Sequence, residues 1–195
     1  MGMGLAAQLS RANEVRIGSR DAGKASIAAA RIAGVKGGTN ANVARWCDAA
    51  IVAVPFSGIG ALKELDGALA GKLVVSIVNP LRTEGPVLQY ASDGPSAAEL
   101  VARALPRSAV STAFNNIAAA FIRRPPEEGL SVLIAAGTRE TYERTAGLVR
   151  SIPRMEPLYA GPLSQAQSVE RLTVVVLNAA ALNGVSRFSP KFVSK

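Results

Sequence analysis

The sequence contains no histidine, a single cysteine and only nine aromatic residues among 195. The absence of histidine removes the commonest general base and the usual metal ligand from any candidate site. Cys47 alone cannot form an internal disulfide, which fits the reducing cytoplasm. No charge-free apolar run reaches the roughly 18 residues of a membrane helix. We therefore expect a cytoplasmic protein with no membrane span, no metal site and no histidine-based chemistry.

Positive charge is in excess. Lysine and arginine outnumber acidic residues by 22 to 14, which gives a formal net charge of +8. Such a surface attracts anions. The basic residues are spread along the chain and no nucleic-acid-binding motif accompanies them, so nucleic acid is not the expected partner. A small polyanionic ligand and an ordinary solvated surface are both compatible with this charge.

Apolar strand-like runs alternate with helix-like stretches, which is typical of a parallel α/β fold. Strands are expected at 14–18, 49–54, 73–78, 109–113, 131–136 and 157–160. Helices are expected at 4–11, 22–33, 40–47, 59–69, 96–105, 139–151 and 164–183, with a short one ending at Ile122 and an irregular basic tail from Val185. We predict one doubly wound, Rossmann-like domain over residues 1–195 with a mostly parallel sheet, in which residues 130–195 form a C-terminal extension over the sheet edge and the acceptor site.

The chain opens on a glycine turn, with Gly2 and Gly4, that runs into a helix. A short strand follows and ends at Ser19-Arg20. In a dinucleotide-binding unit the adenosine ribose is read roughly 20 residues beyond the glycine fingerprint. Gly2 would then be the last glycine of that fingerprint. We therefore expect the first strand of the sheet and two further glycines upstream of Met1, with that strand central in the sheet.

The clearest indication of a ligand-binding site in the sequence comes from Ser19, Arg20 and Lys24. A site that reads an unphosphorylated ribose would place a carboxylate here. Arginine instead pairs bidentately with phosphate oxygens, and Lys24 lies one helical turn beyond Arg20. Asp21 is placed to cap the following helix. The pattern predicts a site for the 2′-phosphate of NADP, the alternative being an ordinary exposed turn.

Ligands of open parallel sheets bind at the carboxyl ends of the strands. Small, apolar and amide residues occupy these ends, and none is a carboxylate placed as an acid or base, so we expect no catalytic side chain. Asn79-Pro80 is either a strand-ending turn or a contact with a nicotinamide, and the same alternatives hold for Asn115-Asn116. The residues at these ends are Val54, Pro55, Phe56, Asn79, Pro80, Leu81, Asn115 and Asn116.

From residue 1 to about residue 192, the sequence resembles the NADPH-dependent reductases of coenzyme F420. The glycine turn, Ser19-Arg20 with Lys24, Val54-Pro55 and the helix start at Ser96 all match. The most specific match is the block from Gly161 to Ser164 with the segment that follows it, because it is not part of the general Rossmann pattern.

This resemblance implies an oxidoreductase that moves a hydride between NADPH and a 5-deazaflavin, coenzyme F420. Cofactor-binding residues would be Gly2, Gly4, Ser19, Arg20 and Lys24 toward the adenine half, and Val54, Pro55, Phe56, Asn79, Pro80, Leu81 and Ala119 toward the nicotinamide half. The deazaflavin would lie near Asn115, Ile117 and Leu163. The apolar helix around 172–182 would pack on the sheet or on a second subunit of a homodimer.

Two alternatives stay open. Family members often carry Trp after the Val-Pro pair and His-Thr near the Asn pair, where this sequence has Phe56 and Asn115-Asn116. A related NADPH-dependent reductase with a flavin or ferric acceptor is therefore one alternative. The other is a truncated NADP-binding module without turnover.

Overall fold

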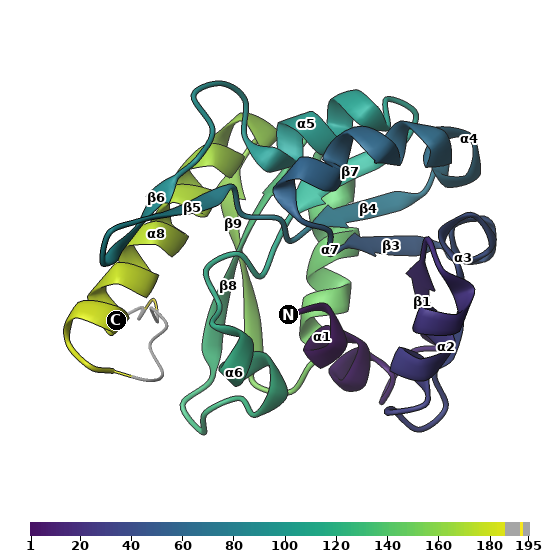
Figure 1. The fold of residues 1–195 in the computed structure, drawn as a ribbon, viewed down its shortest axis with the longest axis horizontal. Coiled ribbons are helices and arrows are strands. Elements are labelled where there is room, and N and C mark those ends of the chain that lie inside the picture. Colours follow the sequence, from purple (N-terminus) through teal and green to yellow (C-terminus); the bar gives the residue numbers. More distant parts are fainter. Residues whose placement is uncertain (186–191, 193–195) are drawn as a thin grey trace.

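The computed structural model describes residues 1–185 and residue 192, so most of the predicted basic tail lies outside the described residues. The strands are β1 (Arg16–Ser19), β2 (Lys36–Thr39), β3 (Ala49–Val52), β4 (Leu73–Ser76), β5 (Leu81–Glu84), β6 (Val87–Tyr90), β7 (Ala109–Thr112), β8 (Leu130–Ala136) and β9 (Met155–Gly161). The helices are α1 (Gly2–Leu9), α2 (Ala22–Ala29), α3 (Asn40–Trp46), α4 (Asp66–Leu69), α5 (Ala97–Ala104), α6 (Ala119–Arg123), α7 (Arg139–Arg150) and α8 (Ala166–Leu182), with 3₁₀ segments η1 (Phe56–Leu65) and η2 (Leu163–Gln165). Figure 1 shows their arrangement.

The main sheet has five strands in the order β3-β4-β7-β8-β9. The first three are parallel, with Leu73 opposite both Ala49 and Ala109, and β8 runs antiparallel to β7. All four residues of β4 are buried. A parallel strand covered on both faces should be apolar throughout, as the sequence of β4 is. The mostly parallel α/β fold predicted from the sequence is confirmed.

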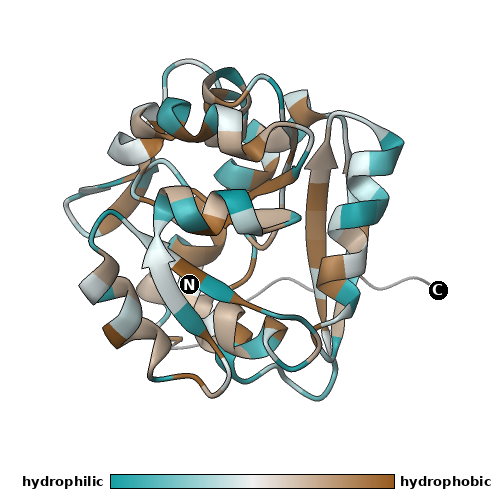
Figure 2. Ribbon diagram, turned by 90° about the vertical axis from the view of Figure 1, so that its right-hand side faces the viewer, coloured by the Kyte–Doolittle hydropathy of each residue, from teal (hydrophilic) through white to brown (hydrophobic). Residues whose placement is uncertain are grey.

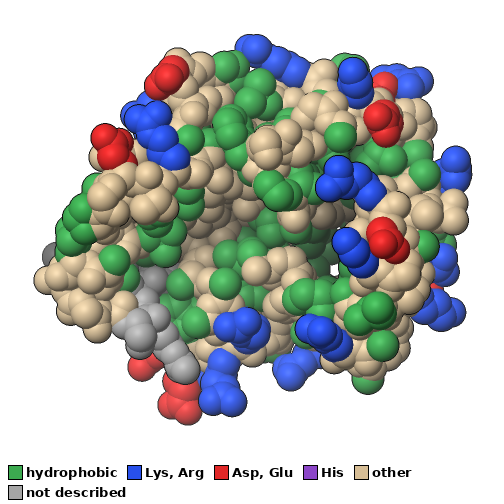
Figure 3. All heavy atoms as spheres, viewed as in Figure 1, with side chains coloured by type: hydrophobic (Ala, Val, Ile, Leu, Met, Phe, Trp, Pro, Cys, Tyr) green, Lys and Arg blue, Asp and Glu red, His purple; other side chains and the backbone are tan. Residues whose placement is uncertain are grey.

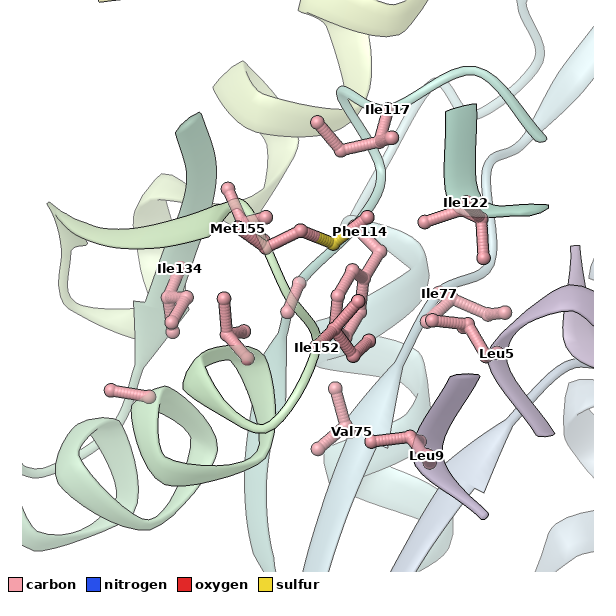
Figure 4. Close-up of a cluster of buried hydrophobic side chains, with 14 of the residues drawn as sticks. Leu5, Leu9, Val75, Ile77, Phe114, Ile117, Ile122, Ile134, Ile152 and Met155 are labelled. Atoms are coloured by element: carbon pink, nitrogen blue, oxygen red, sulfur yellow. The ribbon is translucent and has the colours of Figure 1, made fainter. Parts of the chain in front are cut away.

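Hydrophobic clusters cover both faces of the main sheet. One contains Leu5 and Leu9 of α1 together with Val75 and Phe114, as Figure 4 shows. The other lies on the opposite face and contains Val74 with residues of α3, α5 and η1. Val74 and Val75 point to opposite faces because side chains alternate along a strand. Figure 2 shows a strand of the sheet that is hydrophobic along its length, whereas the helices carry hydrophobic and hydrophilic residues in turn.

Most predicted elements form within a few residues of their expected bounds, and the helix start at Ser96 is a capping box with Glu99. The stretch 59–69 forms η1 and α4 in place of one helix. Two features were not predicted from the sequence: strand β2, which contains two glycines, and the hairpin β5–β6. None of the described helices is both long and apolar enough to cross a membrane.

A second, smaller sheet consists of β1 and β2 in parallel. Strand β1 forms no ladder with β3, although both border one cavity of about 740 Å³. In Figure 3 the molecule is hollowed in this region.

Candidate functional site

The turn between β1 and α2 is organised by Asp21. Its carboxylate accepts hydrogen bonds from the backbone N–H groups of Gly23 at 2.8 Å and Lys24 at 3.1 Å. The Ser19 hydroxyl accepts a 3.3 Å bond from the N–H of Asp21. The predicted cap is confirmed, and the charge of Asp21 is turned toward backbone donors at the helix start.

Arg20 and Lys24 flank this capped turn, and both are exposed. Neither side chain forms an ion pair or hydrogen bond with another described residue. Two cations without a partner among the described residues thus lie four residues apart in the sequence, Arg20 before the N-cap of α2 and Lys24 in its first turn. Asn40 lies close by: a Cβ built on Gly18 would be 2.9 Å from its side-chain oxygen. The sequence analysis did not single out Asn40, and its position at the end of a strand that was itself missed explains why.

The N-terminus of α1 lies beside the carboxyl end of β3. A Cβ on Gly2 would be 3.0 Å from the Cβ of Ala53. The N–H groups of Gly4 and Leu5 bond the carbonyl of Met1, which leaves the N–H groups of Gly2 and Met3 outside the helical ladder. Free N–H groups at a helix start favour anions. The N–H of Gly2 is therefore available at this helix start, and its contact with a phosphate stays a prediction.

Gly4 has a different environment. It is buried, and a Cβ on it would lie 3.1 Å from a side-chain carbon of Ile122 in α6. Its N–H is also engaged by Met1. The missing side chain lets α1 pack closely on α6. The geometry thus assigns Gly4 to helix packing, and its predicted cofactor contact has no support from these neighbours.

At the end of β3, Pro55 is exposed, whereas Val54 and Phe56 are half-buried. Both half-buried side chains pack against the cluster that contains Val74. Leu81 and Ala119 are also half-buried, and Pro80 is buried. The predicted nicotinamide-side residues therefore range from exposed to buried, and Val54, Pro55 and Phe56 offer a small, largely apolar surface at one strand end.

Asn115 joins the carboxyl ends of β4 and β7. Its side-chain N–H₂ group donates to the carbonyl of Val78 at 3.1 Å and to the side-chain oxygen of Asn79 at 2.9 Å. Its own side-chain oxygen accepts a 2.6 Å bond from Thr112. Every side-chain donor of Asn115 is used within the protein. Asn79, in contrast, is half-buried, and its N–H₂ group has no partner among the described residues.

The turn after β7 is backbone-strained. Phe114 has φ of 62°, in the left-handed region that few non-glycine residues adopt. Thr173 of α8 holds this turn by donating a 2.7 Å bond to the carbonyl of Asn115. The neighbouring Asn116 binds strand β8 instead, through the carbonyl of Ser131 and the N–H of Leu133. Asn115 thus connects the ends of β4 and β7, whereas Asn116 binds β8.

The residues predicted near the acceptor do not share one surface. Asn115 is 1% exposed and Ile117 is 2% exposed. Ile117 belongs to the hydrophobic cluster shown in Figure 4. Leu163, at the start of η2, is half-buried. Of these three, only Leu163 reaches the surface of the molecule in this conformation.

Among the charged residues that the structure describes, Glu170 is the most deeply buried, with 0% exposure. Its carboxylate accepts from the Tyr90 hydroxyl at 2.7 Å and from the backbone N–H groups of Ala97 and Ala98 at 3.0 Å each. Burial raises the pKa of Glu170, although these three donors oppose the shift. Burial and the neighbouring carboxylate also raise the pKa of Tyr90.

This contact set ties three elements together: hairpin β5–β6, the start of α5 and helix α8. Asn178 adds a second tie, bonding both the N–H and the carbonyl of Leu88. In the sequence analysis Glu170 is covered only as part of the segment after Ser164 that resembles the family. In the sequence, Glu170 is a lone carboxylate at the start of an apolar helix. This feature could have indicated a buried capping group.

The described residues offer little support for thiol or metal chemistry. Cys47 is buried, and burial raises the pKa of its thiol. No three Cys, Asp or Glu side chains gather into a metal-binding group in the described part of the chain. The site therefore offers unpaired cations, helix N–H groups and an amide, which together suit an anionic ligand with a planar amide group.

The chain is similar to known proteins in sequence and in structure. Residues 1–80 match the family model described as NADP oxidoreductase, coenzyme F420-dependent. A curated F420-dependent NADP reductase of Methanothermobacter marburgensis is 34% identical, over 91% of this chain and 86% of the relative. That of Methanothermobacter thermautotrophicus is 32% identical, over 94% and 86%. A crystal structure from Arthrobacter, provisionally assigned as an F420-dependent NADP reductase, superposes with a TM-score of 0.84 at 24% identity, over 99% and 94% of the two chains.

Proposed function

Because this chain belongs to the family of F420-dependent NADP reductases, we propose that it transfers a hydride between NADPH and the deazaflavin coenzyme F420. The observation that carries the NADP half of the proposal is the capped turn after β1. There Arg20 and Lys24 are exposed, close in sequence and free of acidic partners.

The 2′-phosphate of NADP would lie against Arg20 and Lys24, with the Ser19 hydroxyl beside it. The capping bonds of Asp21 turn its carboxylate away from this position. An arginine fork and an ammonium group suit a dianionic phosphate. The pyrophosphate would face the free N–H groups of Gly2 and Met3 at the start of α1.

The nicotinamide would lie across the ends of β3 and β4. Val54, Pro55 and Phe56 offer an apolar surface for the ring, and the free N–H₂ group of Asn79 is a donor for the carboxamide oxygen. Asn115 fixes the orientation of Asn79 by binding its side-chain oxygen. Asn115 would therefore act as a positioning residue in place of the direct substrate contact predicted from the sequence.

No acid or base is required of the protein. The bound cofactors supply the hydride chemistry, and the protein holds the two rings at contact distance and in register. The deazaflavin would approach from the side of Leu163, whose side chain is half-buried at the start of η2. The net charge of +8 favours the arrival of both polyanionic ligands.

The direct test is hydride exchange between NADPH and F420, followed by the loss of NADPH absorbance and the change in deazaflavin absorbance together. Exchange at a rate far above the protein-free control supports the proposal. NADPH binding without exchange would remove F420 as acceptor and leave the NADP site intact. Failure to bind NADPH would remove both halves.

A cytoplasmic location and a homodimer are also proposed. The single cysteine supports the first. Exposed Val175 and Leu182 on α8 support the second, because two large apolar side chains on one helix favour contact with another apolar surface. Cell fractionation and analytical ultracentrifugation check the two proposals separately.

A further inference from the structure

Strand β5 has an outer edge that no other described strand covers. The small sheet that contains it consists of two strands, β5 and β6. Figure 1 shows this hairpin beside α8, with its turn at the edge of the molecule. Arg82, Thr83 and Glu84 of β5 are all exposed. An open strand edge presents N–H and C=O groups that can pair with another strand.

The hydrogen-bond pattern of the hairpin shows which residues direct their backbone groups outward. The N–H of Ala91 donates to the carbonyl of Pro80 at 2.8 Å, so these two residues form a hydrogen-bonded pair. Along an antiparallel ladder, such pairs alternate with pairs whose backbone groups point away from each other. Thr83 and Leu88 lie opposite each other three positions further along the hairpin. Their backbone groups therefore point to the two outer edges of the hairpin.

The two outer edges have different surroundings. On β6, the side chain of Asn178 in α8 binds both the N–H and the carbonyl of Leu88, at 2.8 and 2.9 Å. The Tyr90 hydroxyl of the same strand binds Glu170 of α8. On β5, no residue in the described part of the chain bonds the N–H or the carbonyl of Thr83. Helix α8 thus holds one edge of the hairpin in place and leaves the other edge available.

The charges of β5 are self-complementary about Thr83. Arg82 precedes Thr83 and Glu84 follows it, with the side chains of both 61% or more exposed. If two β5 strands pair antiparallel about Thr83, Arg82 of each copy lies opposite Glu84 of the other. Pairing about Arg82 or about Glu84 would instead place like charges opposite each other. Because unlike charges across a strand pair are favourable and like charges are unfavourable, the charges favour a second copy centred on Thr83.

We propose that two copies of this chain associate through β5, with the two strands antiparallel and Thr83 on the two-fold axis. The N–H of Thr83 in each copy donates to the Thr83 carbonyl of the other, and the two hairpins form one four-stranded sheet. A two-fold contact uses the same patch on both copies, as this one does. The inference rests on the homodimer proposed above, for which it specifies the contact and the register. Because the paired segment is short, we expect a dimer that dissociates on dilution.

Charge reversal on β5 tests this register. Arg82→Glu leaves only carboxylates across the two strands, and Glu84→Arg leaves only guanidinium groups. Each variant should raise the dimer Kd about tenfold or more, because both unlike pairs become like pairs. Sedimentation velocity up to about 1 mM protein measures the Kd, and circular dichroism checks that the exposed substitutions leave the fold intact. Arg139→Glu, which breaks an exposed ion pair with Glu143 on α7, is the matched control and should keep the Kd of the unaltered chain.

An equimolar mixture of the two β5 variants separates pairing between copies from pairing within one strand. A mixed dimer of Arg82→Glu and Glu84→Arg regains both unlike pairs across the strands, whereas the charges within each chain stay alike. We expect the mixture to dimerise with a Kd near that of the unaltered chain. A mixture that stays monomeric would overturn the contact. An unchanged Kd in both single variants would also overturn it while leaving the homodimer in place, and an unaltered chain that is monomeric throughout would overturn both.

Discussion

The side-chain amide of Asn115 donates a 2.9 Å hydrogen bond to the side-chain oxygen of Asn79, which links the carboxyl ends of β7 and β4. Asn115 is buried and has both amide hydrogens engaged, whereas Asn79 is half-buried and keeps its own N–H₂ group free. A buried residue thus orients one that can reach a ligand.

Asn115→Ala is expected to weaken both folding and NADPH binding. It leaves the Val78 carbonyl and the Thr112 hydroxyl without this partner, at a cost of about 1–3 kcal/mol of unfolding free energy. It also frees Asn79 to rotate, so we expect a higher Kd for NADPH. Asn116→Ala, which removes bonds to β8, should lower stability with little change in Kd. Urea unfolding and fluorescence titration of NADPH measure the two effects, and equal Kd changes in both variants would contradict the positioning role.

Arg20→Glu is expected to weaken NADPH far more than NADH, since a phosphate partner is replaced by a like charge. Loss of a charge-assisted contact corresponds to at least about tenfold in Kd for NADPH, or about 1.4 kcal/mol. Arg31→Glu makes the same charge change at an exposed position just beyond α2 and serves as the control. Equal losses for both cofactors with Arg20→Glu would show that Arg20 does not read the 2′-phosphate.

Glu170 is expected to make stability fall as the pH rises. Its pKa is raised in the folded protein, mainly by burial, above the ordinary value of 4.5. The folded state therefore holds this proton more tightly than the unfolded state does. The resulting stabilisation is complete below pH 4.5 and is lost as the pH rises through the folded-state pKa.

Glu170→Gln should remove this pH dependence while lowering stability, because a Gln side chain cannot accept from all three donors that the carboxylate binds. Urea unfolding from acid to neutral pH measures the slope. Glu64→Gln, at an exposed position in η1, is the matched control and should keep the slope of the unaltered protein. An unchanged slope in Glu170→Gln would exclude Glu170 as its source.

Gly37→Ala is expected to disrupt the β1–α2–β2 unit. The added Cβ would lie 2.4 Å from the carbonyl carbon of Ala25 and 2.5 Å from the nitrogen of Ser26, both backbone atoms of α2. We expect a loss of about 3 kcal/mol, the upper range for overpacking. Gly147→Ala in α7 meets nothing within 4 Å and should instead stabilise by up to about 1 kcal/mol. Thermal unfolding compares them, and similar melting temperatures would contradict the close approach.

The sequence alone determined the features that depend on local pattern. Apolar runs such as Leu73–Ser76 specify buried parallel strands, and Asp21 and Ser96 specify helix starts through their own side chains. Arg20 and Lys24 were singled out in the same way, by their spacing and their place after a strand, and the phosphate site that they indicate stays a prediction.

Only the tertiary structure decided which residues are turned inward. Asn115 and Ile117 follow a strand end, as ligand-binding residues do, but the left-handed turn at Phe114 and the bond from Thr173 bury them. Glu170 acquires its partners from segments more than seventy residues away. Hairpin β5–β6 is held by Asn178 of a distant helix. The burial of these polar and strand-end residues is set by contacts between remote segments, which local sequence pattern does not encode.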